Sequence, residues 1–367
     1  MKAFLCLSDG TVFEGQSLGA VGVTVGETVF NTGMTGYQEV LTDPSYYGQI
    51  ITMTYPIQGN YGINDEDGES LKAWGKGFIV RESCDAPSNF RKTGKLDEYL
   101  KKQGIIGIMG IDTRAVTRKI REQGVMNGAI VSGDDAESLI KSPELMDKIN
   151  SYVITGAVDA VTCKKAEVFE PEGEMLKNVA LYDFGYKHNI LRSLLKRGCR
   201  VTLLPADTSA KEVLKGGYDG IMLSNGPGDP AENTAIISEL KKLRKSGLPI
   251  FGICLGHQLM ALAAGAKTEK LKYGHRGANH PALDIEKDRT YITSQNHGYA
   301  VVADTLPKDI CKLSFVNVND NTVEGVRYFD APVFTVQFHP EACPGPQDTG
   351  YLFDEFMKLM EGEKTCR

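Results

Sequence analysis

The second half of the chain alternates short apolar runs with segments of helical periodicity, and this alternation limits the fold more than any other feature. The apolar runs are five or six residues long and lie at Val179–Phe184, Val201–Pro205, Gly220–Ser224 and Pro249–Ile253. Helical patterns lie at His188–Lys196, Ala210–Leu214, Asn233–Ser246 and His257–Ala264. Strands that alternate with helices predict right-handed crossovers and a parallel sheet. The runs are apolar at nearly every position, as expected where helices cover both faces of the sheet.

The first half has a different texture, and we interpret it as a separate domain. Residues 1–163 contain short β-type runs broken by Gly, Asn, Asp and Pro, which predicts a smaller, irregular α+β domain. Residues 164–178 hold seven charged side chains together with Pro171 and Gly173, and we predict a linker there. The alternative is a long surface loop within one domain. The second domain then covers residues 179–367.

Charge and apolar content exclude several classes of function. The chain has 41 basic and 47 acidic residues, a net charge of −6, so we expect no nucleic-acid partner. No apolar run approaches the roughly 20 residues of a membrane helix, and the first residues lack the apolar core of a signal peptide. We therefore expect no membrane association and a cytoplasmic location. The eight cysteines show no C-x-x-C spacing, and no common metal-ligand spacing fits His257, His275, His280 and His297, so we expect no metal site.

One cysteine stands in a pattern that can carry chemistry. The residues G-x-C-x-G at 252–256 follow an apolar run and precede a helical one, which predicts a sharp strand–turn–helix connection with the Cys254 thiol at its tip. Glycines two residues before and after the thiol relieve the crowding of such a turn. The helix that follows directs its N-terminus at the sulfur and favours the thiolate. The alternative is a buried cysteine in an ordinary turn, and these five residues alone do not decide between the two.

A second motif, His339-Pro-Glu341, follows the apolar run Val333–Phe338. Residues i and i+2 of an extended segment share a side, and Pro340 favours extension at His339, so we expect the imidazole and the carboxylate side by side. Taken alone, H-x-E is more often a solvated histidine beside a salt-bridged glutamate. Together with Cys254 in the same α/β unit, it predicts a nucleophile, a base and an orienting carboxylate.

These motifs carry a family resemblance. Gly252–Gln258 and Phe338–Glu341 resemble the motifs of class I, triad-type glutamine amidotransferases. Further segments resemble the small subunit of carbamoyl-phosphate synthetase: Asn31–Glu39, Thr42–Tyr46, Gly110–Arg114, Leu223–Pro230, Ser294–Gly298 and Pro344–Pro346. The resemblance spans nearly the whole chain. It implies a flavodoxin-like or α/β-hydrolase-like parallel-sheet amidotransferase domain, preceded by a smaller α+β N-terminal domain.

The resemblance also implies a function. The chain would hydrolyse L-glutamine to glutamate and ammonia, and a large subunit would use the ammonia, bicarbonate and ATP to make carbamoyl phosphate for arginine or pyrimidine synthesis. The sequence has no P-loop pattern, so we expect no cofactor on this chain, with ATP and magnesium used by the large subunit. We expect the N-terminal domain to be the main docking surface. The alternatives are the amidotransferase subunit of another synthase, or a non-catalytic regulatory scaffold with the same fold.

The resemblance assigns roles to individual residues. The catalytic residues are Cys254, His339 and Glu341, and the expected glutamine-binding residues are Ser45, Gly226, Gly228, Leu255, Gln258, Asn296, Gly298 and Tyr299. The backbone N–H groups of Gly228 and Leu255 are the expected oxyanion donors. Two positions depart from some family members: Arg276 replaces a second histidine, and Tyr299 stands where many carry phenylalanine.

Overall fold

The chain divides into two compact units in a computed structural model that describes residues 1–342 and 344–362. The units are Met1–Ile154 and Thr155–Arg367. The division therefore falls before residues 164–178, which the sequence analysis interpreted as the linker. In that segment Glu167–Phe169 forms strand β10, which pairs with strand β12 (Cys199–Pro205) of the second unit. The charged segment thus contributes an edge strand, because its three extended residues satisfy their backbone groups on the neighbouring strand.

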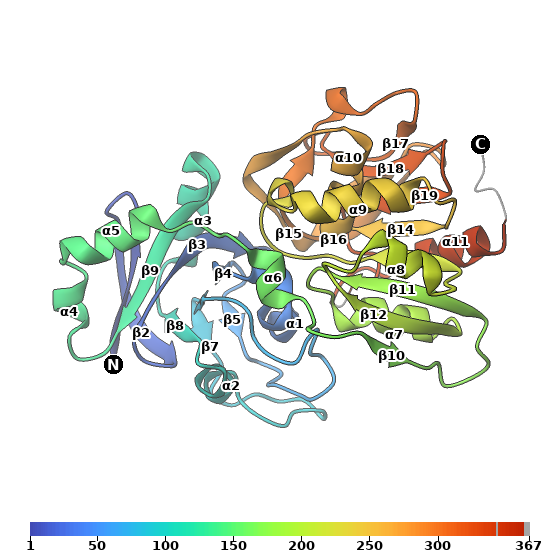
Figure 1. Ribbon diagram of the computed structural model, residues 1–367. Helices are drawn as coiled ribbons and strands as arrows, with labels where there is room; N and C mark the ends of the chain where they lie inside the picture. Colours follow the sequence, from blue (N-terminus) through green and yellow to red (C-terminus); the bar gives the residue numbers. More distant parts are fainter. Residues whose placement is uncertain (343, 363–367) are drawn as a thin grey trace. The chain divides into compact units, whose positions relative to one another are not determined.

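The first unit contains a closed barrel within residues 1–154 (Figure 1). The strand order is β1-β2-β8-β6-β4-β3-β9, with parallel pairing among β3, β4, β6 and β8 and antiparallel pairing elsewhere. Closure leaves no free strand edge, and side chains such as Tyr37, Phe78 and Ile51 fill a buried core. The strands are β1 (Lys2–Leu7), β2 (Val12–Gly19), β3 (Val23–Asn31), β4 (Gln49–Met53), β5 (Ile57–Gln58), β6 (Gly77–Ile79), β7 (Glu82–Ser83), β8 (Ile106–Met109) and β9 (Met126–Ser132).

Two helices of this unit, α3 and α5, begin after a residue whose side chain caps the helix. Asp112 accepts a hydrogen bond from the backbone N of Ala115 at 2.9 Å and caps α3, and Ser142 caps α5 in the same way at Leu145. The helices are α1 (Tyr37–Thr42), α2 (Leu96–Gln103), α3 (Thr113–Gln123), α4 (Ala136–Leu139) and α5 (Pro143–Ser151), and η1 (Pro44–Tyr46) is a 3-10 turn. Barrel and helices together confirm the α+β character expected for the N-terminal half.

The second unit is built on a mixed sheet of ten strands among its described residues, in the order β10-β12-β11-β13-β14-β19-β18-β17-β15-β16. Strands β12, β11, β13, β14 and β19 are parallel, and this order is that of flavodoxin-like folds. The remaining strands pair antiparallel. The strands are β11 (Lys177–Asp183), β12 (Cys199–Pro205), β13 (Gly220–Leu223), β14 (Ile250–Ile253), β15 (Thr268–Asp284), β16 (Arg289–Val301), β17 (Cys311–Asn317), β18 (Val323–Tyr328) and β19 (Val333–Val336).

Helices cover both faces of the parallel strands, which confirms the prediction from their continuous apolar character. Adjacent residues alternate between two buried clusters: Ala180 and Tyr182 of β11 lie in one, and Val179 and Leu181 lie in the other. Residues of α8, α9 and α10 pack in the first cluster, and residues of α7 and α11 pack in the second. The helices are α6 (Ala157–Val161), α7 (His188–Leu195), α8 (Ala210–Lys215), α9 (Thr234–Arg244), α10 (Leu255–Ala264) and α11 (Tyr351–Met360), with 3-10 turns η2 (Pro230–Glu232) and η3 (Ala303–Thr305).

Candidate active site

Cys254 lies between strand β14 and helix α10, at the carboxyl end of the parallel strands. Its backbone has φ 52° and ψ −104°, a left-handed conformation that a residue with a side chain rarely adopts. The strain is held in place by hydrogen bonds, because its N donates to the carbonyl of Val336 at 2.9 Å and its carbonyl accepts from the N of Gln258 at 3.1 Å. The structure therefore contains the strand–turn–helix connection that the sequence predicted, with Cys254 as its buried corner.

Two glycines permit this corner because there is no room for a side chain at either position. A Cβ on Gly256 would lie 2.5 Å from the carbonyl oxygen of Leu223. A Cβ on Gly252 would lie 2.9 Å from Cγ2 of Thr335 and 3.1 Å from the carbonyl carbon of Gly256. The helix can thus start directly beside β13 and β19 only with hydrogen at both positions.

His339 and Glu341 lie beside the elbow because their strand is its neighbour. Ile253 pairs with Val336 in parallel register, so the segments that follow β14 and β19 leave the same edge of the sheet. The strand ends at Val336, two residues earlier than predicted, and the Ala342 N–H donates to the His339 carbonyl at 3.3 Å. The expected side-by-side arrangement is thus reached through a turn, whose φ suits Pro340, and not through an extended strand.

The imidazole and the carboxylate form a short, buried hydrogen bond. His339 Nδ1 lies 2.7 Å from Glu341 Oε1, and the side chains are 1% and 0% exposed. With its proton on Nδ1, donated to Glu341, the imidazole has a lone pair on Nε2. That Nε2 is buried and has no hydrogen-bond partner among the described residues. A base with its second nitrogen unoccupied is what proton transfer to and from a thiol requires.

Lys187 is a third member of this group, and no sequence motif had indicated it. Its Nζ lies 2.9 Å from the Glu341 carboxylate, and its side chain is only 6% exposed. Burial alone would raise the pKa of Glu341, but the charge of Lys187 and the contact with His339 outweigh burial and hold the pKa at about 2. Glu341 therefore remains a carboxylate throughout the neutral range. A usable signal was the position of Lys187 just after β11, at the sheet edge that also holds the elbow.

Most of the expected glutamine-binding residues surround the same edge. Gly226 and Gly228 follow β13, and a Cβ on Gly226 would lie 2.1 Å from the Phe184 carbonyl oxygen. Leu255 is the first residue of α10, so its N–H has no carbonyl partner within the helix. Gly228 has φ 88°, in the region that glycine adopts freely.

Helix α10 and strand β16 bring the remaining candidates together. Gln258 Nε2 donates to the Tyr299 carbonyl at 2.7 Å and to Gln337 Oε1 at 2.9 Å. The Cys254 thiol lies 3.7 Å from the Asn296 carbonyl oxygen. A Cβ on Gly298 would lie 3.2 Å from Nη2 of Arg276, so the guanidinium lies against this strand. The amide group of Gln258 therefore ties the helix to β16 and to the segment after β19.

Comparison with known proteins decides the family. Residues 5–130 match the family described as carbamoyl-phosphate synthase small chain, CPSase domain, and residues 180–359 match glutamine amidotransferase class-I. A carbamoyl phosphate synthase small chain of Clostridium perfringens is 53% identical over 358 residues, 98% of this chain and 99% of that one. The pyrimidine-specific small chain of Bacillus subtilis is 48% identical over 374 residues and covers 100% of both chains. The chain belongs to the carbamoyl phosphate synthase small chain family.

Membership of this family makes the chain a glutamine amidotransferase subunit of the carbamoyl phosphate synthase type. The match at residues 5–130 falls within the barrel unit, and the amidotransferase match falls within the second unit. Ser45 lies in the barrel unit, in η1, where its N–H donates to Asp43 Oδ1 at 2.9 Å. Its role in binding glutamine stays a prediction.

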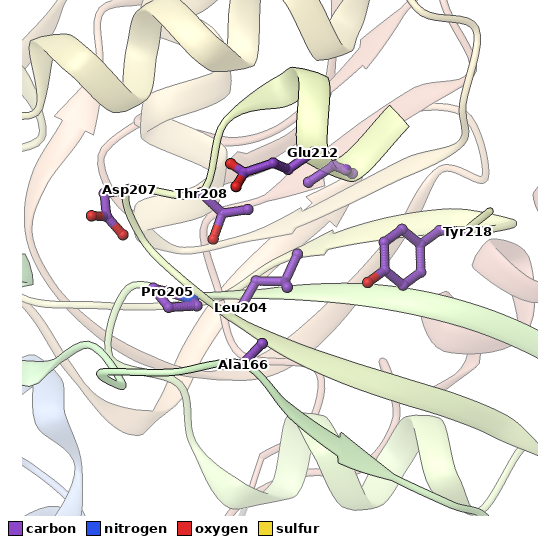
Figure 2. Close-up of a pocket in the computed structure, with 8 residues that line it drawn as sticks. Ala166, Leu204, Pro205, Asp207, Thr208, Glu212 and Tyr218 are labelled. Carbon is purple, nitrogen blue, oxygen red and sulfur yellow. The ribbon is translucent and has the colours of Figure 1, made fainter. Parts of the chain in front are cut away.

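A surface cavity of about 410 Å³ lies elsewhere in the second unit, beside β12 and α8 (Figure 2). Asp207, Thr208, Glu212 and Tyr218 are among its lining residues, and none of the residues proposed for catalysis or glutamine binding is. In the sheet, β11 and β13 separate β12 from the elbow strand β14. In the part of the chain that the structure describes, no helix has the length and apolar character needed to span a membrane.

Proposed function

We propose that the chain hydrolyses L-glutamine to glutamate and ammonia, with Cys254 as nucleophile, His339 as acid–base group and Glu341 as the carboxylate that orients it. The observation that carries the proposal is the pairing of a strained elbow cysteine with a buried imidazole whose Nδ1 is bonded to a carboxylate, at the ends of neighbouring strands. A nucleophile, a base and an orienting group are the parts required for acyl transfer through a covalent intermediate.

The proposed steps use these groups in turn. His339 Nε2 takes the Cys254 proton, and the thiolate sulfur forms a bond to the side-chain amide carbon of glutamine. Backbone N–H groups of Gly228 and Leu255 stabilise the oxyanion. His339 then returns the proton to the amide nitrogen as the carbon–nitrogen bond breaks, which leaves a γ-glutamyl thioester and free ammonia. Water, deprotonated by His339, hydrolyses the thioester and releases glutamate and the thiol.

The chemistry needs no cofactor on this chain. Glu341 stays ionised because its pKa is about 2, so it can stabilise the imidazolium that forms in each step. The ammonia then serves a partner, a large subunit that uses ATP, magnesium and bicarbonate to make carbamoyl phosphate. Support for this partner comes from the small-chain relatives, which match the present chain over 98–100% of its length.

The test separates the glutaminase from the synthetase. In the complex with a large subunit, Cys254→Ser should abolish carbamoyl phosphate synthesis from glutamine and leave synthesis from free ammonia near the wild-type rate. Cys311→Ser is the matched control, since this buried thiol lies outside the elbow and burial raises its pKa to about 11. Near-normal glutamine hydrolysis by Cys254→Ser would refute the assignment. Full activity of the wild type with a different synthase partner would instead favour the alternative family role.

The barrel unit is proposed as the main docking surface for the large subunit. The second unit begins at Thr155 and includes α6, whose Val158 lies in the apolar core, so a chain cut at residue 155 keeps that core. We expect residues 155–367 to fold but to lose stable binding and the stimulation of glutamine hydrolysis that binding brings. Co-purification and glutaminase rates measure both. Equal binding and stimulation of the shortened chain would contradict the assignment.

A further inference from the structure

A buried group of polar side chains lies on the antiparallel side of the second unit, and the proposed mechanism does not use it. We call it the histidine cluster and define it as His275, Gln295, His297, Asp320 and Glu324. Its members come from β15, β16, β18 and the turn before β18. His275, His297 and Glu324 each offer one ligand atom, and these three atoms lie within 4.8 Å of one another.

The hydrogen bonds of the two histidines leave a lone pair of each ring directed into the cluster. His275 Nε2 lies 2.8 Å from the Asp320 carboxylate, and His297 Nδ1 lies 2.8 Å from the Tyr299 carbonyl oxygen. Both partners are acceptors, so each of these nitrogens carries a proton. In the neutral rings, His275 Nδ1 and His297 Nε2 are then the acceptor nitrogens. A carboxylate or carbonyl that holds the far nitrogen in this way is the usual outer partner of a metal-bound histidine.

The acceptor nitrogens face another acceptor. Gln295 Oε1 lies 3.1 Å from His275 Nδ1 and 2.9 Å from His297 Nε2. Its amide is oriented by Nε2, which donates to Thr293 Oγ1 and to Glu324 Oε1. Three lone-pair atoms therefore converge where a donor or a cation is needed. The Glu324 carboxyl group lies beside these atoms: its Oε1 is 3.7 Å from His275 Nδ1, and its buried Oε2 has no hydrogen-bond partner among the described residues.

We propose that the cluster binds a divalent transition-metal cation of the zinc class through His275 Nδ1, His297 Nε2 and the Glu324 carboxylate, with Gln295 Oε1 as the fourth donor. Two imidazoles and a carboxylate are a common ligand set for such ions. Bonds of about 2.0–2.1 Å in a tetrahedron place ligand atoms roughly 3.3 Å apart, close to the spacings of 2.9, 3.1 and 3.7 Å seen here. Small side-chain movements complete the site.

Protons are the competing explanation for the converging acceptors. Burial lowers the pKa of His297 well below its usual value, so a second proton on that ring is disfavoured. A metal-free cluster can instead rotate the Gln295 amide and protonate Glu324, whose pKa burial raises to about 8. The two states differ in composition: one contains one cation per chain, and the other contains none.

A metal ion bound in this cluster would have a structural role. His297 stands between Asn296 and Gly298, two residues proposed to bind glutamine, and the cation would join their strand to β15 and β18. The ligands are fully enclosed, with His275, His297 and Glu324 at most 7% exposed. A closed site with no open position is typical of structural metal ions. The metal content of the chain does not depend on glutamine hydrolysis.

The test measures metal binding by the full-length chain. The protein is loaded with Zn²⁺, passed over a weak chelator and analysed by mass spectrometry for metal content, and Co²⁺ is titrated in parallel to detect the visible absorption of a tetrahedral site. We expect about one equivalent per chain. His297→Asn and Glu324→Gln should each weaken binding at least 100-fold, and Asp320→Asn should weaken it about 10–100-fold by releasing the outer partner of His275. Glu355→Gln, in an ion pair with Lys287, is the carboxylate control and should bind like the wild type.

Three results would overturn the site. Wild-type protein that retains less than about 0.1 equivalent after loading has no such site. Binding of equal strength by Glu324→Gln would place the metal elsewhere, for example on cysteines. Unchanged affinity in Asp320→Asn would contradict His275 Nδ1 as a ligand, because Asp320 is the group that holds the proton on Nε2. This variant is also the safeguard against unfolding, because the Asp320 side chain is 42% exposed.

Discussion

The buried pair of Lys187 and Glu341 gives the sharpest quantitative prediction. Lys187→Met removes the charge that lies 2.9 Å from a fully buried carboxylate and leaves the His339 imidazole, 2.7 Å from Oε1, in place. The pKa of Glu341 then rises, because burial is its largest influence and the opposing charge of Lys187 is gone. The variant must either bury a carboxylate that lacks its cationic partner or protonate it, and both states oppose the proposed role of Glu341.

The magnitude follows from the wild-type pKa. A tenfold change in proton affinity corresponds to 1.36 kcal/mol, so a pKa of about 2 against the ordinary 4.5 corresponds to about 3 kcal/mol. Removal of one partner of a buried ion pair typically costs about 3–5 kcal/mol, in agreement. For a unit of this size we expect Tm to fall by roughly 6–12 °C. Because the pKa of Glu341 is lowered on folding, its contribution is complete above pH 4.5 and is lost as the pH falls toward 2.

Calorimetry is the suitable assay, since the single tryptophan, Trp74, lies in the barrel unit and does not report on the second unit. The difference in free energy of unfolding between wild type and Lys187→Met should be largest at neutral pH and should decrease below pH 4.5. Lys242→Met is the matched control, because its ion pair with Glu239 is largely exposed and should contribute less than about 1 kcal/mol. Equal stability of Lys187→Met and wild type, at every pH, would refute the reasoning.

Two further predictions concern the elbow and the proposed base. Gly256→Ala should lower the free energy of unfolding by at least about 1–3 kcal/mol and reduce glutamine hydrolysis, because its Cβ would lie 2.5 Å from a backbone oxygen. Gly173→Ala is the control: its Cβ would have no atom within 4 Å, so thermal unfolding should not change. Unchanged stability of Gly256→Ala would contradict the steric account. His339→Asn should lower kcat for glutamine hydrolysis by about 10²–10⁴-fold and Glu341→Gln by less, because the first removes the base and the second only weakens its orientation. The reverse order in steady-state kinetics would exchange the two roles.

Local patterns were sufficient to predict the elbow. The requirement for glycine at 252 and 256 arises from atoms of the turn and its immediate neighbours, so the pattern G-x-C-x-G indicates the same geometry in the sequence and in the structure. The parallel strands were predictable for a similar reason, since burial on both faces demands apolar residues at every position. The observed strand boundaries agree less closely with the predicted ones: β12 begins at Cys199, two residues before the predicted start.

Contacts between distant segments were not predictable from the same patterns. The strands of residues 1–154 close into a barrel because of pairings such as that of β1 with β9, more than 120 residues later in the sequence, and local periodicity contains no information on register. The segment at 164–178 looked like a linker because its charges are visible in the sequence, whereas the pairing of β10 with β12 is not.

A thiol at a tight turn and an imidazole two residues from a carboxylate could be identified, with the local elements that hold them, from the order of the amino acids alone. The tertiary structure alone decided their partners. Lys187 reaches Glu341 across 154 residues of chain, and Glu324 meets His275 and His297 from a different strand. The physical reason is that backbone conformation depends mainly on neighbours in sequence, whereas the charge, protonation and coordination of a buried group depend on the atoms that the fold places around it.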